Sequence, residues 1–598
     1  MKNLFSLNDT LLQYRHLLFG GIFFVIISNF FTLYPAQIFR LTIDVLESWV
    51  YILSISDGYI DNAIIPSMMG LMALVAGALV LLASILRGLF LFFTRQTIIN
   101  MSRHVEYEQK NELYSHYQNL TRKFYRTWST GEMMSRISED VSKVRMYTGP
   151  GIMYTINTVT LFIMVISTML MVNVELTLYA ILPLPLLCYA IYKVESMVTH
   201  RSKEIQAKLA DLTAFTQETY SGIRSVKSYV REDALTEVFH AESETLRARA
   251  MALVRVNALF FPSIILLIGL STLFTIWIGG EQVISGRISA GTIAEFVIYV
   301  NLLTWPVASL GWVSTMIQQA GASQGRILEF LGAEPEMDFP TQGPTMGPRM
   351  SIVFKDVHFT YPETGIHALR KVSFEIEAGK TLAIIGKTGS GKSSVASMLL
   401  RLQDADSGEV LLNGHPIQSY TRIELRQSIG FVPQDVLLFS DTIAANIAFG
   451  LAGADQNVIE SAGRFAAIHD NILDFPKGYD TLVGEKGVTL SGGQKQRISL
   501  ARAAIKNPSL FILDDALSAV DTRTEDEILS SLLRLQNQAM PPTVILISHR
   551  ISTVMHADEI LVMENGEIAE RGRHADLLLQ GGLYADIHRI QELESEFI

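Results

Sequence analysis

A glycine-rich stretch between a predicted strand and a predicted helix has the spacing needed to hold phosphate groups. The residues Thr381 to Ile385 predict the strand, the run SVASMLLRL predicts the helix, and they flank the pattern G-x-x-x-x-G-K-S. Glycines let backbone N–H groups close around phosphate oxygens, and the helix N-terminus adds a favourable potential. Lys392 would neutralise the outer phosphates, and the Ser393 hydroxyl would bind Mg²⁺. The residues expected to bind ATP are Gly386, Lys387, Thr388, Gly389, Ser390, Gly391, Lys392, Ser393 and Ser394.

An acidic pair follows a second apolar strand later in the chain. Leu510 to Leu513 are all apolar, and Asp514 and Asp515 come directly after them. A carboxylate at the end of a strand suits a role in holding Mg²⁺ beside the phosphates. On its own this pattern is weak evidence, so its meaning depends on the glycine-rich stretch that precedes it. We expect Asp514 to share the metal ion with Ser393.

The segment LSGGQKQR lies between these two sites in the sequence. It would open another helix whose N-terminus can face an anion. With the phosphate-binding stretch before it and ILDD after it, the segment resembles the nucleotide-binding domain of ABC transporters. The resemblance implies that this helix end faces the γ-phosphate bound by a partner subunit, so that two chains form two shared ATP sites. The residues expected to complete the partner's site are Leu490, Ser491, Gly492, Gly493 and Gln494.

The same resemblance implies roles for five further residues. Tyr361, in HFTYP, matches the aromatic that stacks on adenine, although an ordinary strand aromatic would look the same. Gln434, in FVPQD, matches the glutamine that meets Mg²⁺ and the attacking water, and His549, in LISHR, matches the switch histidine on the γ-phosphate. Glu485, in TLVGEKG, and Asp521, in SAVD, match coupling positions that contact the membrane helices and the second ATP site.

One position departs from the family pattern. The residue after Asp514 is usually a glutamate that polarises the attacking water, and here it is Asp515. Aspartate is one methylene shorter, so its carboxylate would lie roughly 1.5 Å further back. A misplacement of that order can cost about a hundredfold in rate. We therefore expect the catalytic set Asp515, His549 and Gln434 to hydrolyse ATP slowly. This asymmetry resembles the weak-site subunit of bacterial heterodimeric multidrug-type exporters; a homodimer in which aspartate suffices is the alternative.

A long apolar region precedes the predicted ATP-binding residues in the chain. A membrane-spanning helix needs roughly 20 apolar residues. Six stretches meet this length and predict six spans. They run from Leu17 to Phe39, Ile65 to Phe93, Gly151 to Val172, Leu176 to Tyr192, Leu259 to Ile278 and Ile293 to Val313. Six spans before the ATPase in one chain resemble an exporter half-transporter.

Basic residues indicate the orientation of the spans. Arg40 and Arg87 have no Lys or Arg between them, whereas the connection after the second span is rich in both, so that connection and both termini are expected in the cytoplasm. The two inner connections, Thr94 to Pro150 and Lys193 to Asn257, are long and nearly free of glycine and proline, and predict continuous helical hairpins. Two segments in these connections resemble the two intracellular hairpins of the exporter class: FYRTWSTGEMMSRISEDVSKVR and FTQETYSGIRSVKSY.

These observations predict the organisation of the whole chain. Residues 1–332 would form an α-helical transmembrane domain, 333–349 a linker, and 350–598 an α/β phosphate-loop ATPase domain with a helical subdomain. The N-terminal segment lacks the features of a cleavable signal peptide, and is expected to be either a surface helix or a frayed tail. The residues that would form its membrane-facing side are Leu4, Phe5, Leu7, Leu11 and Leu12.

Composition excludes several other classes of protein. The chain is 49% hydrophobic with a mean hydropathy of +0.28, and its formal net charge of −11 argues against nucleic acid as a partner. Cys188 is the single cysteine, so no internal disulfide, cysteine metal cluster or redox pair can form. Six spans also exclude a soluble repair or translation ATPase.

The expected function is ATP-driven export across a membrane, with ATP and Mg²⁺ as cofactors. The resemblance to bacterial exporters implies that this membrane is the bacterial inner membrane. The expected partners are a second half-transporter, membrane lipid and a small amphipathic substrate, drug-like or lipid-like. A homodimeric lipid or peptide exporter and a nucleotide-gated regulatory subunit remain open. Candidate residues for the wall of the substrate cavity, each equally compatible with helix packing, are Tyr154, Asn157, Tyr189, Tyr299, Asn301, Trp305 and Trp312.

Overall fold

The computed structural model describes residues 2–55, 64–335, 337–362, 364–484, 490–537 and 539–596. Its contacts divide the chain into two compact units. The first comprises Met1–Asn119 and Trp128–Glu334, and the second comprises Leu120–Thr127 and Pro335–Ile598. The short helix α4 (Arg122–Thr127) therefore clusters with the second unit, although it lies between helices of the first in the sequence.

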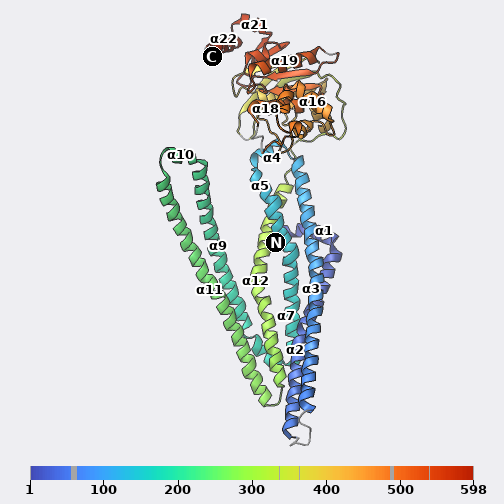
Figure 1. Ribbon diagram of the computed structural model, residues 1–598, viewed down its shortest axis with the longest axis vertical. Helices are drawn as coiled ribbons and strands as arrows, with labels where there is room; N and C mark the ends of the chain where they lie inside the picture. Colours follow the sequence, from blue (N-terminus) through green and yellow to red (C-terminus); the bar gives the residue numbers. More distant parts are fainter. Residues whose placement is uncertain are drawn as a thin grey trace. The chain divides into compact units, whose positions relative to one another are not determined.

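The first unit contains six helices, among the described residues, that are long and apolar enough to cross a membrane (Figure 1). This confirms the six spans predicted from the sequence. The long helices are α2 (Arg15–Ile55), α3 (Ile64–Asn119), α7 (Ile152–Val172), α9 (Leu184–Ser221), α11 (Glu232–Ile284) and α12 (Ala290–Leu331).

The fourth span is interrupted where its prolines lie. The helix α8 (Val174–Ile181) ends just before Pro183, and α9 begins directly after it. Proline removes a backbone donor and so leaves carbonyl groups without their usual helical partners. The hydroxyl of Ser271, on α11, donates to the carbonyl of Ala180 in the last turn of α8, where a helix end leaves carbonyl groups without partners. A neighbouring helix thus makes the break tolerable inside the bilayer.

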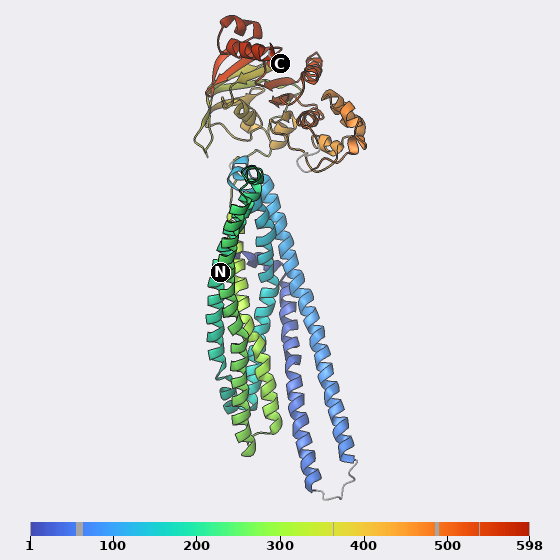
Figure 2. The same ribbon diagram turned by 60° about the vertical axis from the view of Figure 1, so that its left-hand side comes forward.

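The inner connections extend far beyond the apolar spans. At 1.5 Å per residue, the 56 residues of α3 reach about 84 Å, against a hydrocarbon core of about 30 Å. Helices α9 and α11 lie side by side and are joined by α10 (Ile223–Ser228), as Figures 1 and 2 show. The first connection is less regular than the continuous helix predicted, because α3 ends at Asn119 and a capping box formed by Ser129 and Glu132 starts a new helix. The elements that follow α4 are α5 (Thr130–Ser135), the π-helical turn η2 (Arg136–Asp140), α6 (Val141–Met146) and the π-helical turn η3 (Tyr147–Gly151).

The N-terminal segment does not present the single apolar face that was predicted. It forms the 3-10 helix η1 (Lys2–Leu7) and the short helix α1 (Asn8–Gln13). Leu4 and Leu7 are buried within the unit, whereas Phe5 and Leu12 are exposed, so the five apolar residues do not share one membrane-facing side. Polar contacts to α12 fix the segment: the Gln324 amide donates to the Ser6 hydroxyl at 3.0 Å. The prediction assumed an α-helical repeat from the first residue, whereas the 3-10 turn changes which residues share a face.

A buried ion pair links α2 and α12. The Glu295 side chain is fully buried, accepts from the Arg40 guanidinium at 2.8 Å, and also accepts from the Tyr299 hydroxyl at 2.8 Å. Asp44 extends the contact by accepting from the backbone N–H of Gly291 at 3.0 Å. Tyr299 is completely buried in this network, so it belongs to the packing of the helices and not to the wall of a substrate cavity.

Removing Arg40 should destabilise this unit. The variant Arg40→Ala leaves the buried Glu295 carboxylate without its cation; breaking a buried pair costs about 3–5 kcal/mol, and the loss should lie near or below the lower end because Arg40 is 28% exposed. Thermal unfolding in detergent should show a clear fall in Tm. The double variant Arg40→Ala/Glu295→Gln should recover most of it, since no charge is then left buried. A double variant as unstable as the single one would contradict this account of the pair.

The second unit contains two sheets. The antiparallel sheet has the order β2-β1-β4-β5, and the larger sheet has the order β10-β9-β3-β8-β7-β6, in which all neighbours except β10 and β9 are parallel. The strands are β1 (Ile352–Thr360), β2 (His367–Ile376), β3 (Thr381–Gly386), β4 (Ser407–Leu412), β5 (His415–Pro416), β6 (Ile429–Val432), β7 (Leu510–Asp514), β8 (Thr543–Ile547), β9 (Glu559–Glu564) and β10 (Glu567–Gly572).

Helices of this unit pack against the larger sheet and share a core with its strands. The α-helices are α13 (Lys392–Leu399), α14 (Arg422–Gln427), α15 (Ile443–Ala448), α16 (Gln456–Phe465), α17 (His469–Leu473), α18 (Gly492–Ala504), α19 (Thr522–Gln536), α20 (Ile551–Val554), α21 (His574–Gln580) and α22 (Leu583–Glu596). Two 3-10 turns, η4 (Ile417–Ser419) and η5 (Gly478–Asp480), complete the unit. This confirms the predicted combination of a membrane-spanning helical domain and an α/β ATPase domain.

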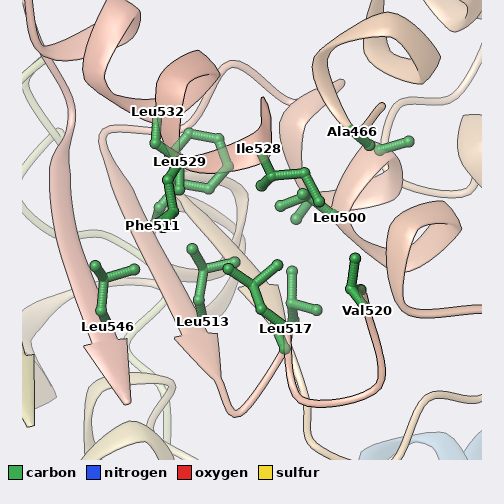
Figure 3. Packing of buried hydrophobic residues seen from close by; sticks show 14 of the residues in the cluster. Ala466, Leu500, Phe511, Leu513, Leu517, Val520, Ile528, Leu529, Leu532 and Leu546 are labelled. Carbon is green, nitrogen blue, oxygen red and sulfur yellow. The ribbon is translucent and has the colours of Figure 1, made fainter. Parts of the chain in front are cut away.

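Alternate residues of the parallel strands face two separate cores. Phe511 and Leu513 of β7 belong to the core on one face, and Leu510 and Ile512 belong to the core on the other. Figure 3 shows Leu529 of α19 packed beside Phe511 on the first face. Burial on both faces is typical of parallel sheets and holds the strand ends in place. The loops after β3, β7 and β8 therefore begin from fixed positions.

Candidate functional site

The carboxyl ends of β3, β7 and β8 open on one cavity of about 870 Å³. The structure brings most of the predicted ATP-site residues together there, and of the phosphate-binding stretch only the buried Ser390 does not line it. The predicted residues that line the cavity are Tyr361, Gly386, Lys387, Thr388, Gly389, Gly391, Lys392, Ser393, Ser394, Gln434, Asp514, Asp515 and His549.

The phosphate-binding stretch is a tight loop between β3 and α13. Gly391, at φ +101°, stands where a Cβ would collide with the carbonyl oxygen of Ala368, so only glycine fits. The Lys392 ammonium donates to the carbonyls of Gly386 and Lys387, each at 2.8 Å. Burial lowers the pKa of Lys392, while Asp514 and Asp515 act in the opposite direction. A half-buried ammonium held by neutral carbonyls is well prepared to exchange them for phosphate oxygens.

Ser393 and Asp514, which were both predicted to hold Mg²⁺, lie within hydrogen-bond distance of each other. The Ser393 hydroxyl donates to the Asp514 carboxylate at 3.1 Å. Burial raises the pKa of Asp514, Asp515 adds to this, and Ser393 and Lys392 oppose it. No group of three or more His, Cys, Asp or Glu side chains that could hold a metal occurs among the described residues. Mg²⁺ needs no such group, because it uses one or two protein oxygens together with phosphate oxygens and water, and these two oxygen donors fit that requirement.

Asp515 lies at the centre of the predicted catalytic set. Its carboxylate is 2.8 Å from the His549 Nδ1 and accepts from the Gln434 amide at 3.5 Å. Its backbone has a φ of +49°, and its N–H donates to the carbonyl of Ile547 at 2.8 Å. The hydroxyl of Ser518 donates to its carbonyl at 2.9 Å. The reach of the carboxylate therefore depends on the length of the side chain, because the backbone is held on both sides.

Tyr361 stands at another edge of the cavity. Its hydroxyl is 3.1 Å from the hydroxyl of Ser394, at the start of α13, and its ring packs edge-on against Phe359 at 4.9 Å between centroids. These contacts fix the ring at the cavity edge, where the Arg126 guanidinium lies over it at 5.0 Å from the centroid. A planar base that stacks on Tyr361 would share the ring with this guanidinium or displace it.

The signature segment belongs to a different surface of the same unit. Ser491 caps α18 in a capping box with Gln494, and the cavity residues do not include Leu490, Ser491, Gly492, Gly493 or Gln494. Gly493 lies against the backbone of Ala519, and Asp521 caps α19 through the backbone N–H of Thr524 at 3.0 Å. The thirteen-residue helix α18 thus presents an N-terminus that this chain's own cavity does not use. Glu485 lies outside the described residues.

Sequence reasoning missed three residues that hold the site together. Gln496, inside the quoted segment LSGGQKQR, donates to Ser518 at 3.2 Å and accepts from Ala519 at 3.1 Å. Arg550, next to His549, donates to the buried Glu525 at 2.9 Å and to the Ser518 carbonyl at 2.8 Å. Gln591, on the last helix, lines the cavity. The first two had a local signal in their motifs, whereas Gln591 had none.

Comparisons with known proteins agree with this arrangement. Residues 18–307 match the family described as ABC transporter transmembrane region, and residues 369–518 match the family described as ABC transporter. The chain is 36% identical over 519 residues to the multidrug resistance-like ATP-binding protein MdlA of Escherichia coli (strain K12), covering 87% of each. It is 33% identical over 520 residues to the ATP-dependent lipid A-core flippase of Syntrophus aciditrophicus (strain SB), covering 86% of this chain and 85% of the relative.

A solved structure extends the comparison to the fold. The structure of a bacterial Atm1-family ABC exporter with ATP bound is 27% identical, with a TM-score of 0.78, and the match covers 96% of this chain and 99% of that one.

Proposed function

Because this chain belongs to the ABC transporter family, as an exporter-type half-transporter that couples ATP hydrolysis to transport, we propose that it works as the weak-site subunit of a heterodimer. Its own phosphate-binding loop would hold ATP and Mg²⁺ in a site that turns over slowly. Its signature segment would complete a competent site on a partner that carries glutamate at the position of Asp515.

The observation that carries this proposal is the short carboxylate at the end of β7. Asp515 replaces the glutamate expected beside the attacking water, and its oxygens already contact His549 and Gln434. The shorter side chain draws the carboxylate back by roughly 1.5 Å. Geometry of this kind favours binding over hydrolysis, since the groups that hold the phosphates are complete and the group that activates water is displaced.

Two chains are needed for either ATP site under this proposal. Lys392 and the N-terminus of α13 would hold the phosphates from one side, and Ser491 at the N-terminus of α18 of the other subunit would face the γ-phosphate. Ser393, Asp514 and Gln434 would hold Mg²⁺, which supplies charge neutralisation at the β- and γ-oxygens. ATP would bind the closed dimer more tightly than the open one and so shift the equilibrium towards closure.

The cargo we propose is hydrophobic or amphipathic, drug-like or lipid-like. The names of the relatives, a multidrug resistance-like protein and a lipid A-core flippase, support this range. Bacterial relatives and the distribution of Lys and Arg between the loops support an inner-membrane location, with the ATPase unit and both termini in the cytoplasm.

Two measurements test this function, one on the native complex and one on reconstituted vesicles. Mass spectrometry of the gently solubilised native complex should reveal a second, different half-transporter in equal amount. ATP-dependent accumulation of a fluorescent amphipathic dye against its gradient should occur in vesicles that hold both subunits. A complex built from this chain alone, with brisk ATPase activity that Asp515→Asn abolishes, would favour the homodimer. Nucleotide binding without uphill dye movement across a panel of amphipathic dyes would favour a regulatory subunit.

A further inference from the structure

The C-terminal helix α22 forms one wall of the nucleotide cavity. Ile587, Ile590 and Gln591 line the cavity alongside the residues already described. The start of this helix is anchored: the Glu570 carboxylate accepts from the backbone N–H of Tyr584 at 3.1 Å, and the fully buried Tyr584 ring contacts His574 through its hydroxyl at 2.7 Å. Helix α22 therefore has a fixed base from which its later residues can act on the site.

Gln591 uses both ends of its side-chain amide on one short segment of backbone. Its NH₂ group donates to the carbonyl of His549 at 2.6 Å. Its carbonyl oxygen accepts from the backbone N–H of Ile551 at 2.8 Å. Ile551 begins α20, and the N–H groups of a first helical turn have no partner within the helix. A single side chain thus satisfies one orphan donor of α20 and holds the carbonyl of His549.

The side chains of the same segment point to the other parts of the site. The His549 ring contacts the Asp515 carboxylate at 2.8 Å, and Arg550 donates to the carbonyl of Ser518 at 2.8 Å and to Glu525 at 2.9 Å. The segment is therefore held through its side chains from the loop after β7 and from α19, and through its backbone from α22. The His549 imidazole is 56% exposed, so neighbouring side chains do not enclose it. Its direction therefore depends on the contact with Asp515 and on the backbone from which it projects.

We propose that Gln591 is a positioning residue that sets the backbone of His549 and so directs its imidazole toward the γ-phosphate. This inference rests on the role proposed for His549. Gln591 touches no reacting atom; it acts through His549, and its loss lets the His549–Ile551 segment rotate. The residues that hold the remaining phosphates, Lys392 among them, make no hydrogen bond to Gln591. The C-terminal helix thereby gains a specific function in the distinction between ATP and ADP.

The test compares binding of nucleotides with and without a γ-phosphate. In the full-length complex, photolabelling with 8-azido-ATP reports nucleotide binding to each of the two chains separately. Competition by AMP-PNP or by ADP then gives the affinity of this chain for each of these nucleotides. Gln591→Leu, which removes both hydrogen bonds, should weaken AMP-PNP binding to this chain about three- to tenfold and leave ADP binding within about twofold. Gln591→Glu keeps the acceptor for Ile551 but sets a carboxylate against the His549 carbonyl, so it should lose at least as much. Arg589→Ala, on the exposed side of the same helix, should change neither affinity.

His549→Ala separates failure of this inference from failure of the proposed site. It should reduce the preference for AMP-PNP over ADP by at least as much as Gln591→Leu. If His549→Ala leaves the preference intact, the role proposed for His549 is wrong. If His549→Ala reduces it and Gln591→Leu does not, the role of Gln591 is overturned. A purely structural effect of Gln591 would weaken ADP and AMP-PNP equally and lower the Tm, which also contradicts positioning.

Discussion

Replacing Asp515 by glutamate should raise ATP hydrolysis at the site on this chain's phosphate loop by up to about a hundredfold. The reason lies in the backbone, which cannot shift to compensate for a short side chain. The N–H of Asp515 donates to Ile547 at 2.8 Å, and its carbonyl accepts from Ser518 at 2.9 Å and from Gln496 at 3.4 Å. One added methylene then moves the carboxylate forward by roughly 1.5 Å, toward the position of an attacking water.

The measurement is the ATPase rate of the reconstituted complex, with the partner's site silenced by substitution of its own phosphate-loop lysine. Asp515→Glu should then be much faster than the parent protein, while Asp515→Asn should be as slow as the parent or slower. ATP affinity should change little, because Lys392 and the loop carbonyls are untouched. Equal rates for the Asp and Glu forms would show that the carboxylate's reach does not limit turnover.

The sequence was informative where a function depends on a short run of residues. The six spans and the strand–loop–helix around Lys392 are local patterns, and the structure has both. The same holds for the helix cap at Ser491, because serine followed three residues later by glutamine is a local signal for the start of a helix. Each of these features is decided within one or two turns of the chain, so hydropathy and spacing suffice to predict it.

Features that join distant segments left no such pattern. The pairing of Arg40 with Glu295 and the contact of Gln591 with His549 depend on how whole elements pack. The residues next to each of them in the sequence do not indicate which distant residue it contacts. The prediction of a single membrane-facing side on the N-terminal segment failed for a related reason. Leu4 and Leu7 are covered by the first unit itself, so their burial reflects tertiary contacts that override the expected membrane-facing helix. The direction of the Asp515 side chain likewise required the surrounding hydrogen bonds to be known.

The signature segment and the phosphate loop of this chain should have unequal effects on the assembled complex. In a heterodimer with one weak site, Ser491 serves the partner's competent site, whereas Lys392 serves only the weak one. Ser491→Arg should therefore lower the steady-state ATPase rate at least a hundredfold, as expected when a donor aimed at transition-state charge is removed and its place is filled. Lys392→Ala in this chain should lower it less than about tenfold, since the competent site stays complete.

The conservative variant Ser491→Thr separates this effect from damage to the helix. Threonine keeps a hydroxyl that can accept from the backbone N–H of Gln494, as Ser491 does at 3.3 Å, so α18 retains its cap and most of the activity should remain. A matched Tm for the Arg and Thr variants would show that the loss comes from the ATP site and not from unfolding. In a homodimer every site contains both residues, so Ser491→Arg and Lys392→Ala would abolish activity alike. Equal losses would therefore overturn the weak-site heterodimer, because only two chemically different sites can make these substitutions unequal.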